Sequence, residues 1–363
     1  MHLMRFFSRE KDETEWYHGR LAVPVSFEMQ GLLYLAILHG ACRANDKSIS
    51  KEINTMKKLV SILLALTLCL GTCLMLTSCG EKTDYTVGIC QLMKHDSLDQ
   101  ATQGFIDALN AEMKKAGKTV AIDTQVAGGV DLCSTVVKTF TAKKTDLIMG
   151  NATPALLAAA NATTTIPVLG TSVTDYADTF GGNIPANVTG TSDAVPFDEQ
   201  AQMMIDSLKL VAGDQVGVLY CTNESNSVIQ YEAVKALFEA KSIVVKAYTF
   251  SETTELQALV TNAANECKAI YIPSDNTVAD NDAIVGTICN EKKVPVYTSY
   301  GGAICYASLA INYYDLGYET GKMAAEILLG TKTPADIEIK TLVPSVVYNK
   351  DLCAQLGITV PEK

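Results

Sequence analysis

The sequence predicts an α/β protein of two similar Rossmann-like lobes, each built on a parallel sheet with crossover helices, joined by a hinge. Three observations support this prediction. From residue 86 onward, short β-branched runs alternate with stretches of helical periodicity. The alternation restarts after a polar, turn-rich stretch at 187–193, which gives two sets of four units. A chain of 363 residues is also long enough for two domains, each able to bury its own core.

The first set begins with a strand at 86–91 and a helix that Ser97 can cap and Gly117 can end. The apolar residues of that helix fall on one face and are Leu98, Ala101, Phe105, Ala108, Leu109 and Met113. Further strands are expected at 120–122, 147–149 and 168–169, each after a helix-length stretch. Such spacing is typical of parallel strands with crossover helices.

The second set predicts strands at 216–220, 243–248, 269–272 and 294–298. Beyond Tyr300 the chain offers a strand at 308–312, a helix at 315–329 and a last strand near 343–347, too little for a third domain. These pieces should complete the two lobes, so that the chain crosses between them more than once. The expected bounds are 86–190 plus about 312–335 for the first lobe and 191–300 plus about 340–360 for the second.

The composition changes sharply before the first lobe. All four Arg, the only Trp and three of the four His precede residue 44. From Cys79 onward there are 20 Lys against 33 Asp plus Glu, with no Arg and no Trp. We therefore expect 1–55 to be a spurious or disordered extension, with Met56 as the true start, and a genuine cytoplasmic extension as the alternative.

An export signal is predicted to begin at Met56. Two lysines are followed by an apolar run at 59–76 and by small residues before Cys79. The stretch Leu-Thr-Ser-Cys at 76–79 resembles the lipobox of bacterial lipoproteins. That resemblance implies a signal peptide at 56–78, lipidation of Cys79, a linker at 79–85 and a lipid-anchored protein outside the cytoplasm. A transmembrane anchor or a buried helix is the alternative.

Composition and motifs exclude several functions. A net charge of −11 opposes binding to a phosphate backbone, so no nucleic-acid partner is expected. The nucleophile-elbow, zincin, EF-hand and dinucleotide-binding motifs are all missing from the sequence, which predicts neither catalysis nor a cofactor. The seven Cys after Cys79 form no C-x-x-C pair and are accompanied only by His95, so we expect buried thiols and no metal site.

Two weaker patterns have ordinary explanations. The segment from Gly317 to Lys322 looks like a phosphate-binding loop but lies within a helical pattern, so an ordinary helix face is predicted. His95 beside Asp96 could form an acid/base pair, but a structural or solvated histidine is the favoured interpretation.

Polar loops occupy corresponding places in the two sets. Thr153-Pro154, Ser225-Asn226-Ser227 and Asn276-Thr277 each follow a strand and open a helix. The carboxyl ends of parallel strands are where open α/β sheets bind ligands, so the loops should line one cleft if the lobes face each other. Helix N-termini can hold a carboxylate without any Arg. Plain helix capping is the alternative at each position.

Other side chains near these loops could complete a site. The acidic residues beside or within the loops are Asp175, Glu224, Asp275 and Asp315, and Asp275 or Asp315 is expected to pair with a ligand ammonium group. Gln91, at the end of the first strand, could supply a hydrogen bond, and Tyr300, at the predicted hinge, an aromatic wall.

Residues 85–361 resemble the substrate-binding lipoproteins of ABC importers of the tryptophan/tyrosine-binding type, which have the type I periplasmic binding protein fold. The matching stretches are Gln91-Leu92-x-x-His95-x-x-Leu98-Asp99, Ala152-Thr153-Pro154-Ala155, Thr171-x-Val173-Thr174-Asp175, Asn187-Val188-Thr189-Gly190-Thr191-Ser192-Asp193, Glu224-Ser225-Asn226-Ser227, Pro273-x-Asp275-Asn276-Thr277-Val278 and Asn312-Tyr313-Tyr314-Asp315-Leu316-Gly317. The sequence departs from the family at 299–302 and 221–222, which affects the identity of the substrate.

This resemblance implies two lobes joined by three crossover segments, with the ligand closed between them. It places Thr153, Thr174, Ser225, Asn226, Ser227 and Asn276 at the cleft. It implies capture of a small ligand, with an aromatic amino acid as the favoured one, for delivery to an ABC permease with its ATPase subunit. A nucleoside- or sugar-binding lipoprotein of the same fold, or a sensory one, is the alternative.

Overall fold

The computed structural model describes residues 56–58, 60–61 and 83–361. The predicted extension at 1–55, Cys79 and most of the predicted signal peptide lie outside the described residues. Residues from Lys82 onward form one compact unit, and the account below concerns that unit.

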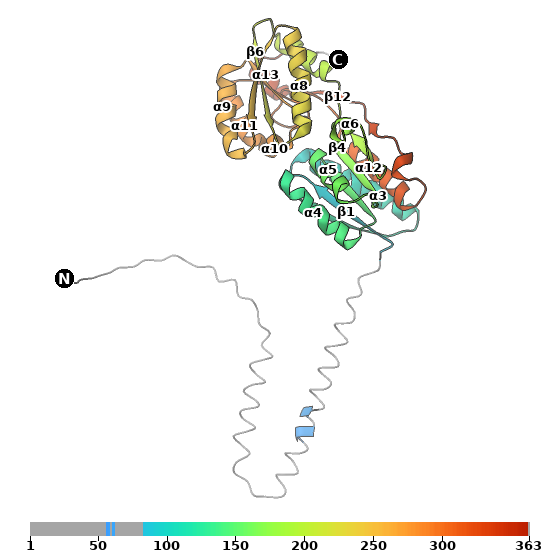
Figure 1. The fold of residues 1–363 in the computed structure, drawn as a ribbon. Helices are drawn as coiled ribbons and strands as arrows, with labels where there is room; N and C mark the ends of the chain where they lie inside the picture. The colour runs from blue at the N-terminus through green and yellow to red at the C-terminus, as the bar shows by residue number, and fades with distance from the viewer. Residues whose placement is uncertain (1–55, 59, 62–82, 362–363) are drawn as a thin grey trace, which may run out of the picture. The chain divides into compact units, whose positions relative to one another are not determined.

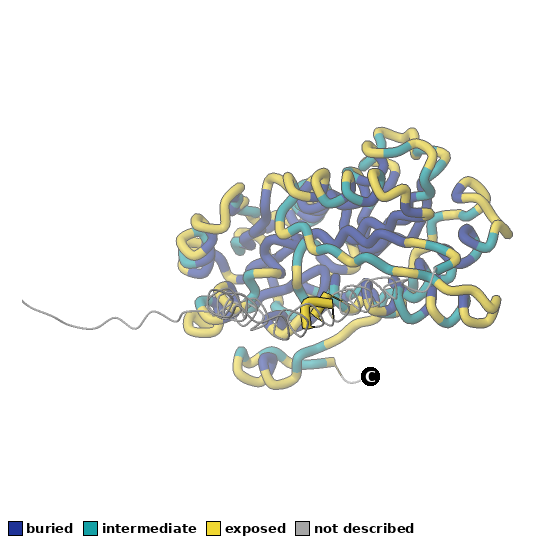
Figure 2. The backbone as a smooth tube through the Cα atoms, turned by 90° about the horizontal axis from the view of Figure 1, so that it is seen from below, coloured by how far each residue is buried: buried dark blue, intermediate teal, exposed yellow. Residues whose placement is uncertain are grey.

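The first sheet has six parallel strands in the order β11-β5-β4-β3-β1-β2 (Figure 1). Its strands are β1 (Tyr85–Gln91), β2 (Val120–Val126), β3 (Leu147–Asn151), β4 (Val168–Val173), β5 (Val188–Ser192) and β11 (Lys340–Thr341). The helices of this lobe are α3 (Asp96–Lys115), α4 (Val130–Lys143), α5 (Thr153–Ala162), α6 (Tyr176–Thr179) and α12 (Tyr313–Leu328), followed by the short η2 (Pro334–Asp336). The buried residues run through the interior of the unit and the exposed ones lie on its outside (Figure 2).

The second sheet repeats the arrangement, in the order β12-β10-β9-β8-β6-β7. Its strands are β6 (Gln215–Cys221), β7 (Val244–Phe250), β8 (Ala269–Ile272), β9 (Val296–Thr298), β10 (Ala307–Ala310) and β12 (Ser345–Tyr348). Its helices are α7 (Phe197–Leu208), α8 (Ser225–Ala240), η1 (Thr253–Glu255), α9 (Leu256–Glu266), α10 (Asn276–Ala279), α11 (Asp282–Lys292) and α13 (Lys350–Leu356). Only β12 runs antiparallel to its neighbour β10 within this sheet.

The predicted fold class of two α/β lobes is confirmed. Each of the eight strands expected in the two sets is present, with ends shifted by a few residues. The chain changes sheet three times: between β5 and β6, between β10 and α12, and between β11 and β12. One boundary differs, because residues from about 340 were expected in the second lobe and Lys340–Thr341 pairs with β5 of the first.

The polar stretch at 187–193, expected to be a turn-rich break, contains the buried strand β5. The threonine hydroxyl groups of β5 are hydrogen-bonded, which offsets the free-energy cost of burying them. Thr189 Oγ1 donates to the carbonyl oxygen of Ile337 at 2.7 Å, and Thr191 Oγ1 lies 2.8 Å from Thr320 Oγ1 of α12. A polar strand is therefore stable here because it is hydrogen-bonded on both sides.

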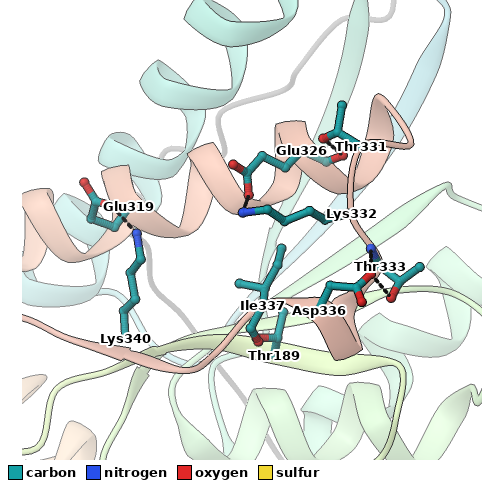
Figure 3. Close-up of polar contacts among 9 residues, drawn as sticks. All are labelled: Thr189, Glu319, Glu326, Thr331, Lys332, Thr333, Asp336, Ile337 and Lys340. Atoms are coloured by element: carbon teal, nitrogen blue, oxygen red, sulfur yellow. Dashed lines mark hydrogen bonds and ion pairs between the residues drawn. The ribbon is translucent and has the colours of Figure 1, made fainter.

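The segment after α12 is fastened to the first lobe by short-range polar contacts (Figure 3). A capping box links Thr333 and Asp336 at η2. The ammonium group of Lys340 lies 3.2 Å from the Glu319 carboxylate of α12. These contacts, with the Thr189 hydrogen bond, position β11 beside β5 before the chain leaves for the second lobe.

Glycines allow α12 to pack directly on α3. A Cβ atom on Gly317 would lie 1.8 Å from the carbonyl oxygen of Ala101, and one on Gly321 would lie 2.4 Å from that of Phe105. Reciprocally, a Cβ on Gly104 of α3 would lie 2.1 Å from the carbonyl oxygen of Tyr314. The segment that looks like a phosphate-binding loop is thus a helix face, as expected from the sequence, and its glycines allow the close packing of the two helices.

We predict that Gly317→Ala destabilises the protein by at least about 3 kcal/mol, because the added methyl group meets backbone that cannot move independently. Urea unfolding followed by circular dichroism measures the effect. Gly129→Ala is the control, since a Cβ atom there meets nothing within 4 Å, and it should cost less than about 1 kcal/mol. Equal losses in the two variants would show that the close approach of α3 and α12 is not what limits stability.

Candidate ligand-binding site

A small hollow lies between the lobes at the carboxyl ends of both sheets. Its lining comes from both lobes and consists of His95, Leu98, Ser172, Asp193, Ser274, Asp275, Asn276, Ala279, Tyr300 and Tyr313. Its volume of about 10 Å³ is roughly what one water molecule needs, so the lobes are closed upon each other here. A larger hollow of about 550 Å³ lies beside the amino ends of β8 and β9 and contains none of the predicted site residues.

Buried polar atoms without a hydrogen-bond partner gather at this edge. Six such atoms occur among the described residues: Asn151 Oδ1, Thr153 Oγ1, Ser172 Oγ, Gln215 Oε1, Asn226 Oδ1 and Ser227 Oγ. Asn151, Thr153 and Ser172 lie at or just after the carboxyl end of a strand, and Asn226 and Ser227 lie in the first turn of α8, the helix that follows β6. A buried polar group left without a partner costs about 1–3 kcal/mol. Their concentration at one edge, in both lobes, is typical of a surface that binds a polar ligand.

The backbone is strained at two of these loops. Ala152, just before Thr153, has a φ of +88°, and Ser172 has a φ of +56°. The pairing of β4 with β5 shifts register between Gly170 and Val173, so Ser172 lies in an irregularity of the strand. Strain of this kind is maintained where a loop must present groups in a fixed direction.

Two hydrogen bonds join the lobes across the cleft. His95 Nε2, before α3, lies 3.2 Å from Oδ1 of Asn276, the first residue of α10. Gln230 Nε2 of α8 donates to Thr174 Oγ1 at 3.3 Å. Burial lowers the pKa of His95, so the neutral imidazole is favoured at this contact. His95 thus has a structural place in the cleft and no carboxylate partner of its own.

Two acids of the second lobe, Glu224 and Asp275, mainly hold the β8–α10 loop in place. Glu224 is fully buried, and its two oxygens accept hydrogen bonds from the backbone N–H groups and side chains of Asn276 and Thr277 at 2.6–3.0 Å. Asp275 accepts from the backbone N–H groups of Cys221 and Val278 at 2.7 and 2.8 Å. Burial and the charge of Glu224 raise the pKa of Asp275 well above its usual value. Both carboxylates tie the β8–α10 loop to the end of β6.

The remaining predicted site residues divide between the hollow and its surroundings. Tyr300 lines the hollow and donates to Asp282 Oδ1 at 2.7 Å. Gln91 is buried but is satisfied within its own lobe by Met93, Asp99 and Thr102. The other predicted residues do not line the hollow: Asp175 caps α6, and Ser225 and Asp315 are exposed. The buried ones among them are Thr153, Thr174, Glu224, Asn226 and Ser227.

Sequence reasoning missed Asp193, the first residue after β5. This carboxyl group is 7% exposed and lines the hollow. Thr174 Oγ1 donates to its Oδ1 at 3.1 Å, and the Tyr313 hydroxyl donates to its Oδ2 at 3.0 Å. Burial raises the pKa of Asp193. Its position at the first crossing between the lobes, which the sequence placed near residue 190, was the available signal, but its burial against Thr174 and Tyr313 becomes evident only from the structure.

A family comparison matches this two-lobed unit. The family model for ABC transporter substrate binding proteins aligns with residues 86–363. The chain belongs to that family. Its two-lobed architecture is that of the type I periplasmic binding proteins, as the resemblance implied.

Individual relatives of this ABC transporter substrate-binding protein have named ligands. A tyrosine-binding protein of Clostridioides difficile is 32% identical over 83% of this chain and 93% of its own. A crystal structure from Streptococcus pneumoniae, described as an ABC domain in complex with L-Trp, is 33% identical, with a TM-score of 0.68 over 76% of this chain and 96% of its own. A conserved domain protein of Vibrio cholerae is 30% identical, with a TM-score of 0.71 over 77% and 97%.

Two features are absent from the described part of the chain. None of its helices combines the length and apolar character needed to cross a bilayer. Within residues 83–361, His, Cys, Asp and Glu side chains form no group of three or more that could hold a metal ion. The seven cysteines of this region are all buried and free, in keeping with the buried thiols that the sequence predicted.

We predict that Asp282→Asn changes the pH dependence of stability. Burial raises the pKa of Asp282 to about 6, so the folded protein binds a proton there that the unfolded chain, with a pKa near 3.8, has already lost. The stability that this group contributes is present at pH 4 and is lost as the pH rises through 6. Asparagine keeps the Oδ1 acceptor for Tyr300, so the variant should gain about 1–2 kcal/mol relative to the wild type between pH 4 and 7.

Urea unfolding at pH 4, 5, 6 and 7 measures this difference. Asp198→Asn, the same substitution at an exposed position of α7, is measured in parallel as the control. A pH-independent difference for Asp282→Asn would contradict the proposed titration.

Proposed function

We propose that this ABC transporter substrate-binding protein captures an aromatic amino acid between its lobes and delivers it to a permease driven by an ATPase subunit. The lobes close by motion about the three crossings, in the manner of two-lobed receptors. The protein binds its ligand without chemical change. It acts outside the cytoplasm, held at the membrane by a lipid on Cys79.

The observation that carries the proposal is the set of five buried polar atoms without partners at the carboxyl ends of the two sheets. Thr153 stands at the N-terminus of α5 and Asn226 and Ser227 at that of α8, where free N–H groups and the helix dipole favour a carboxylate. A ligand contacted from both lobes at once would satisfy these atoms and stabilise the closed form.

Aromatic specificity is supported by the walls of the hollow and by the relatives. Tyr300, after β9 of the second lobe, and Tyr313, at the start of α12 in the first lobe, both line the hollow. Both residues are more than nine-tenths buried. Aromatic pairs prefer offset or edge-to-face contacts, which these rings can offer to a third ring. The relatives named for tyrosine and L-Trp are each more than 30% identical to this chain.

We predict that the purified protein binds at least one of L-Trp, L-Tyr and L-Phe with micromolar or better affinity, as measured by isothermal titration calorimetry. Thr153→Val should weaken binding at least fivefold, because it removes one hydroxyl donor and conserves volume. Thr164→Val, at an exposed position beyond α5, is the control and should leave affinity unchanged. Binding restricted to neutral sugars or nucleosides would contradict the proposal that the ligand is an amino acid.

We also predict that Cys79 carries the lipid. In cells fed a radiolabelled fatty acid, the wild-type protein should take up label and remain with the membrane fraction. Cys79→Ala should take up none and be released, because the acceptor thiol is lost. Cys90→Ala, at a buried thiol of the first lobe, is the control and should still be labelled. Label on the Cys79→Ala variant would show that the anchor lies elsewhere.

A further inference from the structure

Asp193 is a buried carboxyl group whose only described partners are two neutral hydroxyls. Thr174 and Tyr313 each donate one hydrogen bond to it. Among the ion pairs of the described residues, none includes Asp193. A buried carboxylate without a cationic partner is costly, and its ionised form accepts about four hydrogen bonds. Asp193 therefore retains both a charge to compensate and the capacity to accept further donors.

The electrostatics of the hollow favour a cation. Its titratable lining residues are Asp193, Asp275, His95 and the two tyrosines Tyr300 and Tyr313, and no lysine is among the described residues that line it. Glu224 lies directly behind, bonded to Asn276. Two carboxyl groups at the wall and a third behind it, in a site with little solvent, attract an ammonium group.

Asp193 and Asp275 differ in the groups that donate hydrogen bonds to them. Those of Asp275 come from backbone N–H groups and fix the β8–α10 loop to β6. Those of Asp193 come from the side chains of Thr174 and Tyr313. The bond to Tyr313 joins two crossings, since Asp193 follows β5 and Tyr313 opens α12. Thr174 also accepts from Gln230 of the second lobe, so one chain of hydrogen bonds runs from α12 through Asp193 and Thr174 to α8.

We propose that Asp193 binds the α-ammonium group of the amino-acid ligand and, through Tyr313 and Thr174, couples that contact to the crossings between the lobes. This inference rests on the proposed function. It assigns the ammonium partner to a residue other than the two carboxylates that sequence reasoning favoured. Asp315 is exposed on α12, and Asp275 is engaged by backbone.

Asp193→Asn tests the proposal against a ligand pair that differs only in the ammonium group. L-Trp and its deamino analogue indole-3-propionate are each titrated into the wild type and the variant by calorimetry. If the wild type prefers tyrosine, L-Tyr and 3-(4-hydroxyphenyl)propionate form the pair instead. The variant should bind the amino acid at least tenfold more weakly. Its affinity for the deamino analogue should be equal to or greater than that of the wild type, because asparagine removes the charge that repels the analogue's carboxylate.

Asp198→Asn, the same charge change at an exposed position of α7, is the matched control and should leave both affinities within about twofold. Equal loss of both ligands in Asp193→Asn would indicate a purely structural role, and an unchanged affinity for the amino acid would equally overturn the proposal. If Asp193→Asn fails to fold, Tyr313→Phe removes one orienting hydroxyl and should weaken the amino acid selectively by two- to fivefold; no selectivity would overturn it. A wild type that binds no amino acid would refute the proposed function itself, and this inference with it.

Discussion

The arrangement of this protein depends on one constraint, the need of buried polar groups at the carboxyl ends of parallel strands for hydrogen-bond partners. Glu224 and Asp275 meet it within the second lobe, by accepting from backbone N–H groups at the start of α10. Thr153, Ser172 and Asn226 do not meet it fully, because each keeps a buried oxygen without a partner. The same edge therefore has loops held in place by hydrogen bonds and buried polar atoms that still lack a partner. A binding site requires this combination of positioned groups and free hydrogen-bonding capacity.

The connection between the lobes follows from how the chain is packed on each side. Gly317 and Gly321 bring α12 against α3 closely enough to make this late helix part of the first lobe. The chain must then cross again to form β12 in the second sheet. Asp193 and Tyr313 lie at two of the three crossings and are bonded to each other. A ligand that contacts them would act where relative motion of the lobes is concentrated.

Much of the fold was predictable from the sequence because its strands are apolar and its helices amphipathic. The eight strands of the two sets were found on that basis. Val188–Ser192 was not, because threonine, serine and glycine in a buried strand are stabilised by Thr320 and Ile337, residues more than a hundred positions away. A local pattern carries no information on such partners.

The candidate site was predictable at the level of loops but less so for individual roles. Thr153, Asn226 and Ser227 lie at helix N-termini beside strand ends, as their spacing implied. The roles of the acids depend on distances that spacing does not determine. Asp175 caps a short helix, Asp315 lies outside the hollow, and Asp193 emerges only when β5 and α12 are placed together.

The most direct test of this account is a crystal structure of the protein with the amino acid that it binds best. The account predicts a ligand between the lobes, with its carboxylate at the N-termini of α5 and α8 and hydrogen bonds to previously unsatisfied atoms of both lobes. A ligand held by one lobe alone, or seated in the larger hollow beside the amino ends of β8 and β9, would contradict it.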